Sequence, residues 1–197
     1  MKSRLAILVL VGILVACSGI PLRSLPRLMK LQNGLLELNP AEFTLAIQVD
    51  ARMTPPAGGV PIFQLTIRPS TPGSFEAIDS KLPMRFTIAS ANALGLASPA
   101  ADRRWLIYSF PPESQGELLR IQNYFKRIQA QVREKGGGSI SVGISQEDVA
   151  ARDPALAHTR WESWLQTSRR EGFFELWSGP IAELLKQAKP ADSGKSS

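Results

Sequence analysis

Ser145 and His158 are the residues whose types could support nucleophilic catalysis. A serine hydrolase needs a base that accepts the proton of the serine hydroxyl, and His158 is the only histidine of the chain. Ser145 lies in Gly143-Ile-Ser-Gln-Glu147, which keeps the first glycine of a nucleophile elbow but has Glu147 in place of the second. Because nothing in the sequence brings Ser145 and His158 together, a serine hydrolase is only an alternative prediction.

Acidic residues are the next candidates, as metal ligands or as paired catalytic carboxylates. Zinc takes ligands drawn mainly from Cys and His, and this chain has one of each. Glu147, Asp148 and Asp153 could meet calcium, but the spacing of acids and glycine that defines a calcium loop is absent. A solvated helix start explains these acids better. Glycosidase chemistry needs two carboxylates across a cleft, and the 17 acidic residues leave the choice of a pair open.

The glycine run from Gly136 to Gly143 is a weak candidate for a phosphate-binding loop. Such a loop follows a strand and opens a helix, so that amide groups at the helix start face the phosphate. Here the predicted order is helix, glycines, strand, which indicates a flexible turn. We therefore predict no catalytic set, no metal and no cofactor.

Cys17, the only cysteine, is best explained by the segment that precedes it. Lys2 and Arg4 are followed by an uncharged, mostly aliphatic run from Leu5 to Ala16, the layout of a secretory signal. As a helix this run would rise only about 18 Å, against a hydrocarbon core of about 30 Å. It is too short for a comfortable membrane span, so we predict a signal peptide over residues 1–16.

Leu14-Val15-Ala16-Cys17 resembles the lipobox of bacterial lipoproteins, and the whole chain resembles small uncharacterised proteobacterial lipoproteins. The resemblance implies a diacylglycerol on the Cys17 sulfur, cleavage before Cys17 and acylation of the new amino group. It implies export and a membrane anchor in the cell envelope, but no activity. Ser18 stands where an aspartate would favour inner-membrane retention, so the expected location is the periplasmic face of the outer membrane.

Cleavage before Cys17 would lower the formal net charge from +6 to +4 by removing Lys2 and Arg4. An exported protein meets no chromosome, so this mild basic balance does not predict nucleic-acid binding. Arg23, Arg27 and Lys30 follow the anchor, where they would either attract anionic headgroups or belong to a soluble linker. We predict a lipidated tether over 17–40, a single domain over 41–189 and a disordered tail over 190–197.

The domain is predicted to be α+β, with a mainly antiparallel sheet of about six to seven strands covered by one long amphipathic helix and a short C-terminal helix. Alternating apolar residues predict the strands and recurrences at three and four residues predict the helices. The predicted strands cover 43–49, 60–67, 81–90, 104–110, 139–145, 160–167 and 172–177, and the predicted helices cover 112–135 and 180–188.

Several finer expectations follow from the same patterns. We expect 43–49 and 60–67 to form an antiparallel pair, 104–110 to be the central strand, and the last two strands to form a hairpin. Two shorter helices are also indicated: one or two turns around Leu25–Leu31, which either dock on the body or enter the membrane interface, and a capped helix from Ser145 to Ala151.

The predicted hairpin carries large aromatic residues on both faces. Strict alternation places Trp161 opposite Trp164, and places Phe173 and Trp177 opposite Phe174 and Leu176. Either the helices or the tether cover the second face, or part of it is an exposed patch for a protein or lipid partner. We favour coverage, because aromatic residues most often belong to a core.

The favoured function is a non-catalytic binding or scaffolding module, held at the membrane by the lipid on Cys17 and contacting an envelope protein or lipid. The alternative is a carrier of lipid or another apolar ligand, which predicts a cavity lined by residues such as Phe86, Trp105 and Trp164. A hydrolase using carboxylates or Ser145 and His158 is the remaining alternative.

Overall fold

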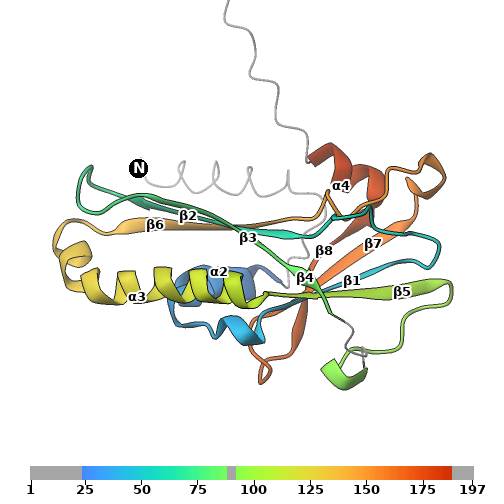
Figure 1. Cartoon of the computed structure of the whole chain (residues 1–197), viewed down its shortest axis with the longest axis horizontal. Helices are drawn as coiled ribbons and strands as arrows, with labels where there is room; N and C mark the ends of the chain where they lie inside the picture. Colours follow the sequence, from blue (N-terminus) through green and yellow to red (C-terminus); the bar gives the residue numbers. More distant parts are fainter. Residues whose placement is uncertain (1–23, 88–91, 188–197) are drawn as a thin grey trace, which may run out of the picture.

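A computed structural model describes residues 24–87 and 92–187 (Figure 1). The signal segment, Cys17 and the predicted tail lie outside these residues. The helices are α2 (Leu25–Gly34), α3 (Pro112–Glu134) and α4 (Ile181–Gln187). The strands are β1 (Thr44–Asp50), β2 (Ile62–Pro69), β3 (Ile78–Pro83), β4 (Arg85–Phe86), β5 (Arg103–Ser109), β6 (Gly138–Ser145), β7 (Arg160–Gln166) and β8 (Phe173–Pro180). Among the described helices, none has both the length and the apolar character that a membrane crossing requires.

The strands form two sheets rather than the one that the sequence predicted. A five-stranded sheet has the order β4-β5-β1-β7-β8, and a three-stranded sheet has the order β3-β2-β6. Each strand pairing is antiparallel. The α+β class and the mainly antiparallel pairing are therefore confirmed, whereas the strand count and the description of the helices only roughly fit, and the single sheet is wrong.

The predicted pairing of β1 with β2 is wrong, because the two strands belong to different sheets. β1 pairs with β5 and β7, and β2 pairs with β3 and β6. The physical reason lies in their faces. β2 buries only Phe63, Leu65 and Ile67 on one side, which suits a sheet with one exposed face, whereas β1 is buried on both sides, which suits a sheet covered on both faces.

The central strand of the five-stranded sheet is β1 rather than the predicted 104–110 segment. β5 has β1 on one side but only the two-residue β4 on the other. The second face of β1 and β5 is covered by Leu94 and Leu96, which pack with Ala46 and Ile107. The alternation of β1 hid this burial, because Thr44 and Gln48 are polar residues that the fold nevertheless buries.

The main core lies between the two sheets and α3. Phe43, Phe63 and Phe110 form an aromatic cluster with ring centroids 4.8–5.5 Å apart. α3 runs alongside the three-stranded sheet (Figure 1) and adds Leu118, Ile121 and Phe125 to the core. These are residues of the predicted stripe, so the predicted helix 112–135 and its packing are confirmed.

Two glycines after α3 make the turn into β6. Gly136 and Gly137 have φ values of 89° and 78°, in the left-handed region that side chains with a Cβ rarely adopt. The amide of Gly137 donates to the carbonyl of Val132, 2.8 Å away, and closes the helix end. The glycine run is therefore a helix-to-strand turn.

α2 docks on the body, which resolves the alternatives for the Leu25–Leu31 segment. Leu31 and the adjacent Leu35 are buried in the main core. Ser24 donates its hydroxyl to the Glu175 carbonyl, and Arg27 donates to the Phe173 carbonyl 3.2 Å away. Because β8 is an edge strand, α2 side chains satisfy carbonyl groups that no neighbouring strand meets. The packed body thus includes residues that the sequence assigned to the tether.

The other local predictions had mixed outcomes. Strand 139–145, the 160–177 hairpin and helix 180–188 are confirmed as β6, β7–β8 and α4. The predicted helix over 145–151 is wrong, because Ser145 ends β6 and the residues after it form turns and a bend rather than a helix. Its amides close tight turns instead, with Val149 donating to the Gln146 carbonyl at 3.0 Å.

Candidate functional site

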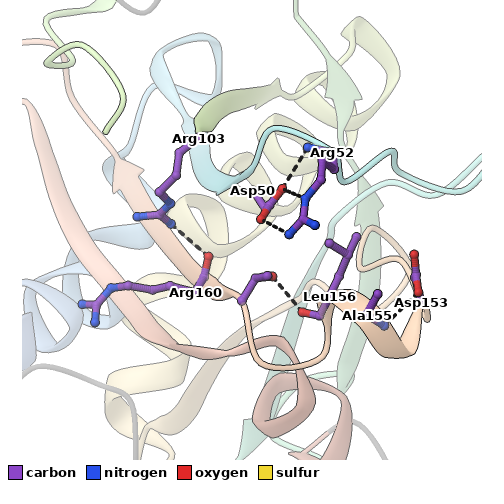
Figure 2. Close-up of polar contacts among 8 residues, drawn as sticks. Asp50, Arg52, Arg103, Asp153, Ala155, Leu156 and Arg160 are labelled. Atoms are coloured by element: carbon purple, nitrogen blue, oxygen red, sulfur yellow. Dashed lines mark hydrogen bonds and ion pairs between the residues drawn. The ribbon is translucent and has the colours of Figure 1, made fainter. Parts of the chain in front are cut away.

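A cluster of charged residues lies where β1 ends and where β5 and β7 begin, and it was not predicted from the sequence. Figure 2 shows the Asp50 carboxylate facing the Arg52 guanidinium, which donates to it at 2.9 and 2.8 Å, and the Arg52 backbone amide also donates to it at 3.0 Å. Arg103 donates to the Arg160 carbonyl at 3.0 Å and forms a 3.1 Å ion pair with Glu162. Each carboxylate of this cluster therefore has an arginine partner.

The electrostatics of the cluster suit a structural role better than proton transfer. Hydrogen bonds from Arg52 lower the pKa of Asp50 from 3.8 to about 2. A general base works best with a pKa near the operating pH, so this carboxylate is a weak one. Arg103 of β5 instead joins neighbouring strands, through its ion pair with Glu162 of β7 and a hydrogen bond to the Gln48 carbonyl of β1.

Asp50→Asn should reduce the loss of stability in acid. Because the folded pKa of Asp50 lies below the unfolded value, its ionised form stabilises the fold above about pH 4, and that contribution disappears as the pH falls toward about 2. Urea unfolding at about pH 6 and about pH 2.5 should therefore show a smaller difference for the variant than for the wild type. Asp148→Asn, at an exposed aspartate, is the control and should leave the difference unchanged. An unchanged difference in Asp50→Asn would contradict the stabilising role.

The structure does not join Ser145 and His158. Ser145 ends β6 opposite Ile62, His158 is exposed, and no hydrogen bond connects the two within the described residues. Asp153 is used locally, since its carboxylate accepts from the Ala155 amide at 2.9 Å (Figure 2). Within residues 24–87 and 92–187, no group of three or more His, Cys, Asp or Glu side chains is placed to hold a metal ion.

The aromatic residues of the hairpin are covered on both faces, but their alternation differs from the prediction. Trp161 is fully buried in the main core, while Trp164 and Phe173 pack on the second face. Phe174 and Trp177 share the main core, although strict alternation placed them on opposite sides. The reason is a bulge: Trp164 pairs with Glu175 and Ser163 with Trp177, so β8 contains one extra residue.

In the part of the chain that the structure describes, the second face of the hairpin is covered neither by the predicted helices nor by the tether. Leu94 and Leu96 of the segment before β5 cover it, with Trp105 donating its indole N–H to the Ala97 carbonyl at 3.0 Å. Phe86 is 54% exposed and meets Tyr108 edge to face. Five of the cavities on the described residues were compared, and Phe86, Trp105 and Trp164 line none of these five. The predicted carrier cavity is therefore not among them.

A different apolar cavity lies between α2, β6, β8 and α4, and we call it the apolar groove. Its volume is about 420 Å³. It is lined by Leu25, Leu28, Met29, Leu31, Val142, Gly143, Ile144, Gln146, Leu165, Leu176, Trp177 and Leu184. Apart from Gly143 and Gln146, all of these residues are apolar.

The fold explains why this groove exists. β6 and β8 are edge strands of the two different sheets, so no strand fills the space between them. α2 presents Leu25 and Leu28 to this space, and α4 presents Leu184. Four elements that are distant in the sequence thus supply one apolar lining.

The polar groups beside the groove are few and mostly satisfied. The Gln146 amide accepts from the Trp161 indole at 2.9 Å and donates to the Ser163 hydroxyl at 3.3 Å. Trp177 is only 6% exposed, and its indole N–H has no acceptor among residues 24–87 and 92–187. A Cβ on Gly179 would lie 2.8 Å from the Trp177 ring, so the ring can occupy this position only because residue 179 has no side chain.

The absence of charge distinguishes the groove from the four other cavities, each of which is lined by charged side chains such as Arg120, Glu147 or Lys30. Of the five predicted hairpin aromatics, only Trp177 lines it. The apolar residues Leu25, Leu28 and Met29, which we call the α2 stripe, were the other signal in the sequence. The sequence could not show that Trp177 and the α2 stripe line the same cavity. Comparisons of the chain with protein-family models, with curated proteins and with solved structures found no match.

Proposed function

We propose that this chain is a lipid-anchored binding module of the cell envelope, and that its apolar groove takes an uncharged aliphatic ligand. The observation that carries the ligand class is the groove lining, which contains no charged residue. The signal-like N-terminus and the lipobox support the anchor and a periplasmic location. A hydrolase has less support, since Ser145 and His158 share no hydrogen bond in the described part of the chain.

The size of the groove supports ligand binding. An apolar cavity of about 150 Å³ is enough to bind benzene, and ligand sites commonly span about 300–1,000 Å³. The volume of about 420 Å³ falls in this range. Removing an aliphatic chain from water supplies about 0.8 kcal/mol for each buried CH₂ group. A groove of this kind therefore gains affinity from chain length rather than from charge.

The position of the groove fits a role close to the membrane. The body begins by Ser24, whose hydroxyl is bonded to β8. Ser24 lies seven positions after Cys17, a separation that spans at most about 25 Å in a fully extended chain. A lipid on Cys17 would therefore hold the groove within reach of the bilayer surface, where apolar ligands are concentrated.

Leu28→Gln should weaken the binding of an apolar probe to the groove. Titration of 1-N-phenylnaphthylamine into the unlipidated mature chain measures this through the rise in probe fluorescence. The variant should bind about tenfold more weakly, because an amide that faces an apolar ligand loses its hydrogen bonds to water.

Leu119→Gln is the matched control, since Leu119 is 45% exposed on α3 and does not line the groove. It should bind the probe as the wild type does. Circular dichroism confirms that both variants remain folded. Equal affinity in the two variants, or no binding by the wild type, would contradict the proposed function.

A further inference from the structure

We propose that, when no other ligand is bound, the apolar groove shelters one acyl chain of the lipid carried by this chain's own Cys17. The inference rests on the proposed function, because it needs both the anchor and a groove that accepts an aliphatic chain. In the resting state the groove is then occupied by this acyl chain, and any external ligand must compete with it.

The length of chain between the anchor and the groove is the first argument. Leu25 is the first groove residue along the chain, and it lies eight positions after Cys17. An extended segment of this length reaches at most about 28 Å. The acyl chains attached to Cys17 therefore start within a short tether of the α2 end of the groove.

Attachment also gives this occupant an advantage over free lipids. A group attached through a short segment of the same chain has an effective concentration of about millimolar order. Its binding is intramolecular, so it pays no new cost for lost translational freedom. An external ligand must therefore displace the attached chain, which limits the groove to ligands with more apolar surface or a better fit.

The number of acyl chains allows this exchange without release from the membrane. The lipobox resemblance implies a diacylglycerol and an acylated amino group, which together supply three chains. One chain alone gives only marginal membrane binding, whereas two signals give stable anchoring. Two chains can stay in the bilayer while the third lies in the groove. The groove volume of about 420 Å³ suits a single chain rather than the whole lipid.

The lining chemistry agrees with an acyl chain as the occupant. The stripe of Leu25, Leu28 and Met29 on α2 contacts the space from the side nearest the anchor along the sequence. Leu184 and Trp177 bound it from α4 and β8. A hydrocarbon chain needs no hydrogen bonds, so a lining without charge binds it without leaving polar groups unpaired.

Photocrosslinking in intact cells tests the inference with the full, naturally processed chain. Cells are grown with a diazirine-bearing fatty acid, which enters both the membrane phospholipids and the lipid anchor. After irradiation, the protein is digested and analysed by mass spectrometry. We expect the lipidated Cys17 peptide to be joined to peptides containing Leu28, Trp177 or Leu184, in a product that migrates as a monomer.

Leu28→Gln should lower the yield of this crosslink about tenfold, while Leu119→Gln should leave it unchanged. Groove peptides that carry only a phospholipid mass, crosslinked dimers, or Cys17 peptides joined only to other surfaces would overturn the inference. The probe titration separates the two proposals. Probe binding without the Cys17 crosslink rejects self-occupancy alone, whereas loss of both rejects the groove as a binding site.

Discussion

Phe63→Ala is expected to lower the free energy of unfolding by about 3–5 kcal/mol. Phe63 is fully buried on β2, in the three-stranded sheet. Its ring lies 5.0 Å from that of Phe43 and 5.5 Å from that of Phe110, the residues that flank β1 and β5 of the other sheet. Truncation removes the ring that joins the two sheets and leaves a cavity that the remaining rings cannot close.

Urea unfolding followed by tryptophan fluorescence measures this loss. The matched control is Phe86→Ala, because Phe86 is 54% exposed and contacts one ring, that of Tyr108. The control should cost about 1 kcal/mol or less. Domains are commonly stable by only about 5–15 kcal/mol, so Phe63→Ala removes a large fraction of the total. Equal losses in the two variants would show that the aromatic cluster does not hold the sheets together.

Features that depend on local periodicity could be predicted from the sequence. The stripe Leu118, Ile121 and Phe125 recurs at helical spacing and is the buried face of α3. β6 and the β7–β8 hairpin likewise follow from alternation and from turn residues. In each case the residues that decide the structure are neighbours along the chain, so the pattern contains the information.

Features that depend on long-range pairing could not be predicted. β1 and β2 are consecutive, yet they belong to different sheets, because β1 is buried on both faces and β2 on one. The bulge in β8 was also hidden, since one extra residue reverses the alternation without changing composition. Such choices are made by packing against distant elements.

The candidate site shows the same limit. Trp177 and the α2 stripe were both visible in the sequence, but their convergence requires that two edge strands from separate sheets lie on either side of one space. Trp105 and Trp164, which the sequence predicted to line a carrier cavity, have a different position in the structure. They cover the second face of the five-stranded sheet together with Leu94 and Leu96. The periodicity of the sequence does not predict this contact.

Cys17→Ser is expected to abolish lipidation and to leave residues 1–16 on the chain. In the lipoprotein resemblance, the acceptor of the diacylglycerol is the cysteine sulfur, and cleavage follows that transfer. A thiol has a pKa near 8.5 and is a far better nucleophile than the serine hydroxyl. The effect should be complete rather than graded, because no other cysteine exists to replace Cys17.

Intact-mass spectrometry of the protein from cells is the decisive measurement, because the uncut apolar segment can itself keep the variant on the membrane. The wild type should have the mass of a chain that begins at Cys17 and carries a lipid, and the variant should have that of the unmodified precursor. Ser18→Ala retains the sulfur and should be processed as the wild type is. A Cys17→Ser chain that is cleaved normally and stays membrane-bound would refute the anchor. The groove would then have to bind its ligand without an attached lipid as competitor.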